Sequence, residues 1–127
     1  MANEFRVTKT ITYSNGQAKY DFDPGSLNLP QGTQGYQHQT VTATSAAADV
    51  SFGNVTTPGL LIMQNLDPTT TGGSVDWGPK STSGVLEPMG TLGPKQTADL
   101  WMNSTTTLRI QRTAAGNTNV AFLLFEN

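Results

Sequence analysis

Most extended stretches of this chain alternate apolar and polar residues. From Glu4 to Tyr13 every second position is apolar apart from Lys9, and similar alternation returns over 97–102 and 108–111. The segment 36–44 has strand character, with Thr40, Val41 and Thr42 at its centre. A period of two residues is typical of a β-strand with one buried face, because successive side chains point to opposite sides of the backbone. No segment shows the period of an amphipathic helix. The pattern therefore predicts an all-β protein.

Two segments depart from this alternation and are apolar on both faces. Leu60 to Leu66 opens with the run Leu-Leu-Ile-Met, and Asn119 to Phe125 closes the chain in the same way. A strand that is apolar on both faces is covered on both faces. A monomeric sandwich would leave one of those faces exposed, and monomers rarely expose large apolar patches. We therefore expect a homo-oligomer, a dimer or trimer.

Turn residues divide the remaining chain into short elements. Ser14-Asn15-Gly16-Gln17 predicts a hairpin, because Asn-Gly tolerates positive φ at both turn positions, and Ala18 to Phe22 is the returning strand. The sequence further predicts a loop over Ser26–Gly35 and a short strand containing Val50 and Phe52. It also predicts a short edge strand over Ser74–Trp77 and a long connection over Gly84–Pro94.

Together these signals predict eight or nine short strands separated by turns. This is typical of a single antiparallel β-sandwich, which we expect to be jelly-roll-like, with an immunoglobulin-like sandwich as the alternative. The length of 127 residues fits one domain over residues 1–127, with a short N-terminal arm over residues 1–6.

Composition excludes several classes of function. The net charge is −2 and the seven Lys and Arg are scattered, so we expect no nucleic-acid partner. The chain has no cysteine, which removes disulfides, thiolate metal sites and cysteine nucleophiles. No apolar stretch approaches the roughly 20 residues of a membrane helix, so no membrane partner is expected. The N-terminal segment lacks the apolar core of a signal peptide, which favours synthesis in a cytoplasm.

Candidate chemistry is sparse. His38 is the sole histidine and has no nucleophile motif near it, so we expect a surface strand residue and no enzyme. No spacing of acidic residues fits a calcium loop, and Asp23-Pro24-Gly25 and Asp67-Pro68 are interpreted as Asx-type turns. We therefore predict no catalytic, cofactor-binding or metal-binding residues. Trp77 and Trp101 remain open, either as exposed contact residues or as parts of the core.

The C-terminal part of the chain carries motifs that resemble those of small virion proteins of tailed bacteriophages. The matching segments are Leu60–Pro68, Leu92–Leu100 and Phe122–Glu126. The chain departs from the family pattern at Gly93-Pro94-Lys95, where the family tends to carry Pro-Gly-Glu. The resemblance covers about the last 70 residues, and its motifs are structural. It implies a head-decoration (cement) protein or a small tail component, made in the cytoplasm of a bacterial host.

The first hypothesis is a virion structural protein on the capsid surface. It would bind the major capsid protein across neighbouring capsid subunits and stabilise the shell by burying apolar area. The residues expected to contact the partner are Phe5, Arg6, Trp77, Met89, Leu92 and Trp101.

The alternative is a carbohydrate- or receptor-binding β-sandwich of a phage tail or fibre. In that case Trp77 and Trp101 would stack on sugar rings, and the hydrogen-bonding residues would be Gln64, Asp76 and Asn103.

Overall fold

The computed structural model describes residues 4–15, 18–23, 26–30, 36–53, 55–69, 72–102 and 106–126. The chain divides into two compact units, residues 1–34 and residues 35–127. We call them the ribbon unit and the sandwich unit. Their boundary does not coincide with the expected arm over residues 1–6.

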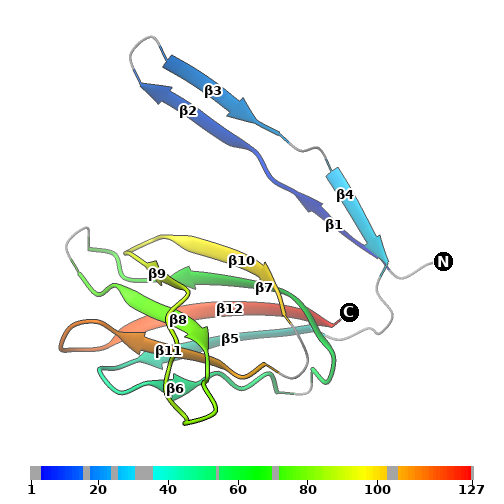
Figure 1. Cartoon of the computed structure of the whole chain (residues 1–127). Helices are drawn as coiled ribbons and strands as arrows, with labels where there is room; N and C mark the ends of the chain where they lie inside the picture. The colour runs from blue at the N-terminus through cyan, green and yellow to red at the C-terminus, as the bar shows by residue number, and fades with distance from the viewer. Residues whose placement is uncertain are drawn as a thin grey trace. The chain divides into compact units, whose positions relative to one another are not determined.

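The ribbon unit consists of two strand pairs that follow one another along the chain. β1 (Glu4–Thr8) pairs antiparallel with β4 (Ser26–Pro30), and β2 (Ile11–Asn15) pairs antiparallel with β3 (Ala18–Phe22). Each of these two sheets has two strands (Figure 1). The predicted hairpin is confirmed by the β2–β3 pairing. The predicted loop is wrong over Ser26–Pro30, where the alternation of Leu27 and Leu29 with polar residues forms the partner strand of β1.

The register separates apolar pairs from polar pairs in each sheet of the ribbon unit. Residues that pair directly across two strands lie on the same face. The apolar pairs are Phe5–Leu29, Val7–Leu27, Ile11–Phe22 and Tyr13–Tyr20. The intervening pairs are polar: Arg6–Asn28, Thr8–Ser26, Thr12–Asp21 and Ser14–Lys19. In each of the two sheets the backbone pairing therefore matches apolar residues with apolar residues and polar residues with polar residues.

The sandwich unit contains eight strands in two antiparallel sheets of four (Figure 1). The strands are β5 (Tyr36–Ala43), β6 (Ala48–Asp49), β7 (Pro58–Asn65), β8 (Val75–Pro79), β9 (Gly90–Leu92), β10 (Thr97–Trp101), β11 (Leu108–Arg112) and β12 (Thr118–Glu126). One sheet has the order β10-β7-β12-β5 and the other β6-β11-β8-β9. The first strand pairs with the last, the second with the seventh, and so on inward. This nested pairing is the jelly-roll arrangement, so the predicted all-β sandwich is confirmed.

The core lies between the two sheets. Its largest fully buried apolar side chains come from both of them: Leu61, Met63, Val75, Leu108, Ile110, Val120 and Phe122. Each of these residues occupies an inward position of a strand whose neighbouring positions are more exposed, apart from Leu61, which follows the buried Leu60. The two doubly apolar strands, β7 and β12, lie side by side in the middle of one sheet. Their outward residues Ile62, Ala121 and Leu123 are half-buried, and the other sheet of the sandwich does not cover them.

Three further expectations need correction. The short strand predicted at Val50 and Phe52 lies earlier, at Ala48–Asp49. The strand predicted as an edge over Ser74–Trp77 is an interior strand, because β8 is bonded to both β11 and β9. The connection predicted over Gly84–Pro94 contains β9, which is only three residues long. Across the described ranges no helix is long and apolar enough to cross a membrane.

Candidate functional site

An apolar groove opens at one end of the sandwich, between the two sheets. It has a volume of about 240 Å³. Its lining residues are Trp77, Gly78, Pro79, Met89, Leu100, Trp101, Met102, Thr106 and Leu108. We call it the tryptophan groove. It is lined by β8 and β11 of one sheet and by β10 of the other, and Thr106 supplies its only side-chain hydroxyl.

The short β9 explains why the sandwich is open here. β9 pairs with β8 only from Val75 to Trp77, whereas β10 continues through Trp101 along its own sheet. Beyond Gly90 the edge of β8 is met by an irregular segment, in which Met89 donates its backbone N–H to the carbonyl of Trp77 at 2.9 Å. The end of β10 therefore faces β8 and β11 across the groove, next to an irregular segment and not a further strand.

Two glycines let the groove walls approach one another. A Cβ on Gly78 would lie 2.0 Å from the backbone carbonyl oxygen of Glu87, so only glycine allows the segment before β9 to lie this close to β8. A Cβ on Gly90 would lie 2.8 Å from Cζ2 of Trp77. Gly90 thus leaves space for the indole ring, which packs against the core with its inner edge and lines the groove with the rest.

The tryptophan groove brings together three of the six residues that the sequence suggested as partner contacts. Met89 is 69% exposed and Trp101 is 53% exposed, while Trp77 is half-buried. Leu92 lies elsewhere, in the core at 4% exposure, so its side chain is not available to a partner. The sequence did not predict that Leu100 of β10 lines the groove, because its alternating position is typical of an ordinary core residue.

The remaining two predicted contacts belong to the ribbon unit. Arg6 is exposed and pairs with Asn28 across the strands, on the polar face. Phe5 pairs with Leu29, on the apolar face by register, and its side chain lies outside the described residues. Both residues are in β1, which is bonded to β4 of the same chain.

The residues suggested for sugar binding do not converge on the groove. Asp76 is in β8, where its position alternates with that of Trp77, and it accepts a hydrogen bond from the hydroxyl of Thr91 at 2.5 Å. Gln64 is exposed on β7, in the other sheet. Asn103 lies outside the described residues. The groove itself offers few hydrogen-bonding groups, whereas sugar recognition requires several.

A second apolar surface lies on the outer side of the β10-β7-β12-β5 sheet. Its central row runs across all four strands: Asp99, Ile62, Leu123 and His38 are aligned by the register. The next row is Thr97, Gln64, Ala121 and Thr40. We call these two rows the outer sheet face. A shallow hollow of about 200 Å³ lies on it and includes His38, Ile62, Gln64, Ala121 and Leu123 in its lining.

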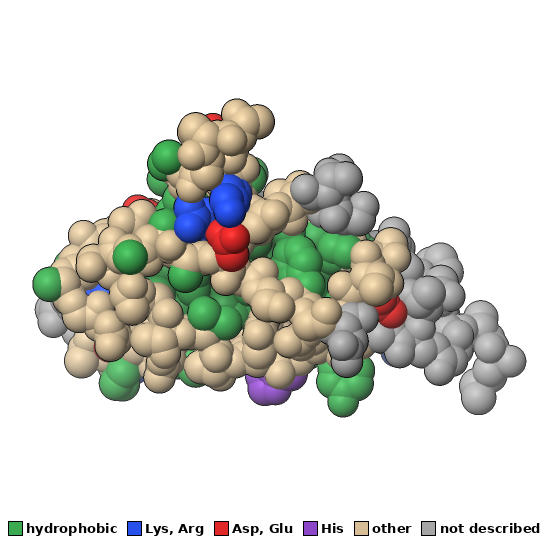
Figure 2. All heavy atoms as spheres, turned by 90° about the horizontal axis from the view of Figure 1, so that it is seen from below, with side chains coloured by type: hydrophobic (Ala, Val, Ile, Leu, Met, Phe, Trp, Pro, Cys, Tyr) green, Lys and Arg blue, Asp and Glu red, His purple; other side chains and the backbone are tan. Residues whose placement is uncertain are grey.

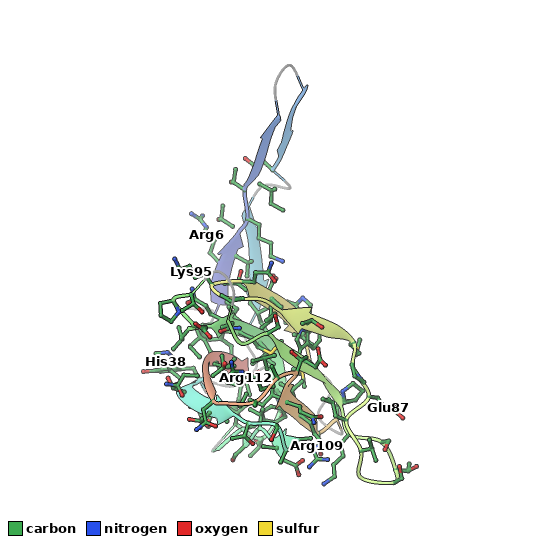
Figure 3. The ribbon with its side chains drawn as sticks, turned by 90° about the vertical axis from the view of Figure 1, so that its left-hand side faces the viewer. Arg6, His38, Glu87, Lys95, Arg109 and Arg112 are labelled. Atoms are coloured by element: carbon green, nitrogen blue, oxygen red, sulfur yellow. The ribbon has the colours of Figure 1, made fainter. Side chains whose placement is uncertain are left out.

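His38 is exposed on this outer sheet face, and Figure 3 places it on the opposite side of the sandwich unit from Glu87. Its neighbours in the hollow are apolar residues and Gln64. Among the described residues no three His, Asp or Glu side chains form a group that could hold a metal ion.

A polar network joins the end of β7 to the segment before β8 and to the end of β9. The buried Asn65 donates from Nδ2 to the carbonyl oxygens of Gly73 at 2.8 Å and Leu92 at 3.0 Å, and its Oδ1 accepts the N–H of Asp67. Asp67 accepts the N–H and hydroxyl of Thr69 and the N–H of Gly73. The donors from Thr69 hold the pKa of Asp67 below its usual value. The predicted Asx-type turn at Asp67 is confirmed.

The charged side chains that the structure groups together also link strands. Asp49 lies 3.1 Å from Nζ of Lys80 and 2.7 Å from Nε of Arg109, and the hydrogen bond from Lys80 lowers the pKa of Asp49. Arg109 also donates to the carbonyl oxygens of Ala47 and Gly84. Figure 2 shows basic side chains beside acidic ones on one face, with apolar side chains exposed in hollows between polar ones. The contacts of Asp49 and Arg109 connect β6 and the loop before β9 to β11.

The fold and its surfaces define a class: an all-β jelly-roll sandwich with an apolar groove at one end. No protein-family model matches the chain, and no curated protein does either. Among solved structures, a protein of Bacillus endospore appendages, described as a novel family of disulfide-linked pili, is similar at 17% sequence identity. The match covers 78% of this chain and 96% of that one, with a TM-score of 0.35.

Proposed function

We propose that the protein is a structural virion subunit that decorates a capsid and stabilises it by binding the major capsid protein across neighbouring subunits. The observation that carries this proposal is the tryptophan groove. It gathers Trp77, Met89 and Trp101, three of the six residues that the sequence predicts as partner contacts. The motifs shared with small phage virion proteins supply the class of partner.

The chemistry of the groove favours a protein ligand. Tryptophan and methionine are enriched in protein interfaces, and anchors in apolar pockets contribute most of the binding free energy. Methionine is flexible, so the groove wall at Met89 can adapt to an inserted side chain. An apolar side chain from a capsid subunit would lose its hydration on entering the groove, which favours binding by about 25 cal/mol per Å² before association costs.

The ribbon unit provides a second surface for the same task. A two-stranded ribbon is at best marginally stable alone in water. Its apolar face, defined by pairs such as Phe5–Leu29 and Ile11–Phe22, gains stability when another protein covers it. A subunit that holds a shell together needs two contact surfaces, one for each side of the boundary that it spans. The groove and the apolar face of the ribbon are the two candidates.

The groove is tested by Met89→Glu, with Val85→Glu as the matched control. Both side chains belong to the segment between β8 and β9, and they are 69% and 60% exposed. Met89→Glu is expected to abolish co-sedimentation with capsids that lack the protein, because it places a charge at the groove wall. Val85→Glu is expected to bind as the wild type does. Equal binding of both variants would refute a role for the groove.

The ribbon is tested by Phe5→Ala. If the apolar face of the ribbon contacts the capsid, this variant binds capsids more weakly while the melting temperature of the isolated protein stays unchanged. A fall of several degrees with binding retained would assign Phe5 to the subunit's own stability instead.

A further inference from the structure

The sandwich unit has four edge strands, and β5 is the one that carries no protection against pairing. The other three are short or charged: β6 has two residues, β9 has three, and β10 has five and carries Asp99. β5 (Figure 1) has eight residues without a proline, a lysine or an acidic residue, and its pairing with β12 has no bulge. Proteins protect long edge strands with such features, because an open edge pairs with other strands. An edge of this kind is therefore expected to have a strand as its partner.

Printed hydrogen bonds in the sheet fix which backbone groups of β5 point to its open edge. In antiparallel sheets, residues whose N–H and C=O point to one neighbouring strand alternate with residues whose groups point away from it. Asn65 directs its groups to β10, because its N–H donates to the carbonyl of Gln96 and its carbonyl accepts from Lys95. Its register partner Val120 therefore directs its own groups to Val41 of β5. In β5 the odd-numbered residues thus bond to β12, and the even-numbered residues face the edge.

Four residues present their backbone groups to this edge: Tyr36, His38, Thr40 and Thr42. Among the described residues, none bonds to the N–H or C=O groups of these four. Their side chains are exposed as well. A hollow of about 350 Å³ lies at the start of the strand, lined by Tyr36, Gln37, His38 and Gly53. The described residues therefore leave space beside the edge.

We propose that the protein forms a two-fold dimer in which β5 pairs antiparallel with β5 of a second copy, so that the two sheets become one continuous sheet. The backbone sets the direction of the axis. An axis perpendicular to the sheet reverses the strand and gives antiparallel pairing. An axis along the strands would give parallel pairing with every residue opposite its own equivalent. That arrangement sets N–H against N–H, whereas a parallel ladder requires an offset of one residue.

Full overlap of the two strands is the register that uses every open group. It pairs Tyr36 with Thr42 and His38 with Thr40 of the other copy, and four N–H groups on each strand then form about eight hydrogen bonds. An aromatic residue beside a β-branched one is a favourable cross-strand pair. A shift by two residues in either direction leaves Tyr36 or Thr42 beyond the end of the partner strand. It also sets His38 or Thr40 opposite its own equivalent.

The surroundings of β5 favour a second copy over an unrelated peptide. Peptides that add to a sheet edge gain specificity from pockets that receive alternate side chains. On the inner side of β5 the chain's own segment 51–53 takes this space, because Gln39 donates to the carbonyl of Ser51 and Gly53 lies against the amide of Gln37. The hollow at the start of the strand has no aliphatic lining residue. Pairing of β5 with itself needs no pocket, since the two edges match group for group.

Disulfide trapping reads the register directly, because the chain contains no cysteine. Residues of a hydrogen-bonded pair have Cα atoms about 5.5 Å apart, within disulfide reach, whereas diagonal neighbours lie about 7–8 Å apart. An oxidised mixture of His38→Cys and Thr40→Cys is therefore expected to give a disulfide-linked dimer, and neither variant alone is. Thr91→Cys, at an exposed position of the other sheet, is the control and is expected to link to neither.

The register and the dimer can each be overturned by this experiment. A disulfide formed by His38→Cys alone or by Thr40→Cys alone would overturn full overlap. A mixture that stays unlinked would overturn the dimer through β5, whether the protein then sediments as a monomer or as a dimer through another surface.

Proline substitution tests the backbone bonds apart from the side chains. The N–H of Thr40 points to the edge, so Thr40→Pro keeps the ladder with β12 and removes a donor at two symmetric positions of the dimer. The dimer dissociation constant, measured by sedimentation, is expected to rise about tenfold or more, while the circular dichroism spectrum stays that of the wild type. Thr40→Ala keeps the N–H and is the matched control, with a smaller expected rise. Equal dissociation constants for the two variants would refute backbone pairing through this edge.

This inference does not rest on the proposed function. Dimerisation is measured on the isolated protein, whereas the groove is tested by capsid binding of Met89→Glu, and β5 contributes no residue to the groove.

Discussion

The ribbon unit and the sandwich unit differ in what covers their apolar faces. In the sandwich, each sheet covers the inner face of the other, and Met63, Val75 and Val120 are fully buried. Among the described residues, the ribbon unit has two sheets of two strands each, β1-β4 and β2-β3. Ile11 is 58% exposed there. The same alternating pattern therefore encodes a closed core in the sandwich unit and, as we propose, a contact surface in the ribbon unit.

This difference predicts that stability resides in the sandwich and that binding resides on the exposed apolar surfaces. Three substitutions and one truncation test this assignment. They are ordered here from the largest expected effect on the free energy of unfolding to the smallest.

Phe122→Ala removes the largest fully buried side chain. It leaves a cavity between the sheets, so the free energy of unfolding is expected to fall by about 3–5 kcal/mol, measured by urea denaturation. Ile11→Ala in the ribbon provides the comparison and is expected to cost below about 1 kcal/mol, because its side chain is mostly exposed. Similar losses for both variants would show that the ribbon has a core of its own.

Asn65→Ala leaves the buried carbonyl oxygens of Gly73 and Leu92 without their donor. Unsatisfied buried polar groups are costly, so we expect a loss of about 2–3 kcal/mol in the free energy of unfolding. The exposed Asn119, whose Oδ1 accepts from Thr42, is the matched control, and Asn119→Ala is expected to cost less. An equal loss for Asn119→Ala would remove the structural role assigned to the buried amide.

Asp67→Asn tests the pH dependence of the sandwich. The pKa of Asp67 is lowered in the folded protein, so its contribution to stability is present above its ordinary value of 3.8 and is lost as the pH falls through the lower folded value. The urea midpoints of wild type and variant are therefore expected to differ at pH 7 and to converge as the pH falls below about 4. A constant difference at all pH values would contradict this origin of the effect.

Removing residues 1–34 is expected to change the stability of the sandwich least. The fragment 35–127 retains all eight strands and the whole buried core. Its melting temperature, followed by circular dichroism, is expected to stay within a few degrees of that of the full chain. A fragment that fails to fold would show that the ribbon is part of the sandwich's own stability.

Much of the fold could be predicted from local pattern alone. The alternation over β10 and β11 and the double apolarity of β7 and β12 identified these strands, because side-chain direction in a strand depends only on position along it. The Asx-type turn at Asp67 was likewise readable, since its hydrogen bonds span only a few residues.

The prediction failed where a strand is defined by its partner. β9 contains one apolar residue between a glycine and a turn, so it has no period to detect, and its extended form comes from pairing with β8. β4 was interpreted as a loop because Asn28 and Pro30 weaken its pattern, yet β1 supplies a complete antiparallel partner. Leu92 was interpreted as a contact residue because nothing local indicates which side of β9 faces the core.

The candidate site, like the fold, was predictable from the sequence only in part. The sequence by itself determined an all-β chain with Trp77, Met89 and Trp101 as unusual residues outside the apolar runs, since composition and period are local properties. Only the tertiary structure decided that these three line one groove, that Asp76 and Gln64 lie elsewhere, and that Asp99 and His38 end the same row. Such neighbours are brought together by strand pairing across long stretches of chain, and that pairing depends on the burial of the whole core, which no single segment encodes.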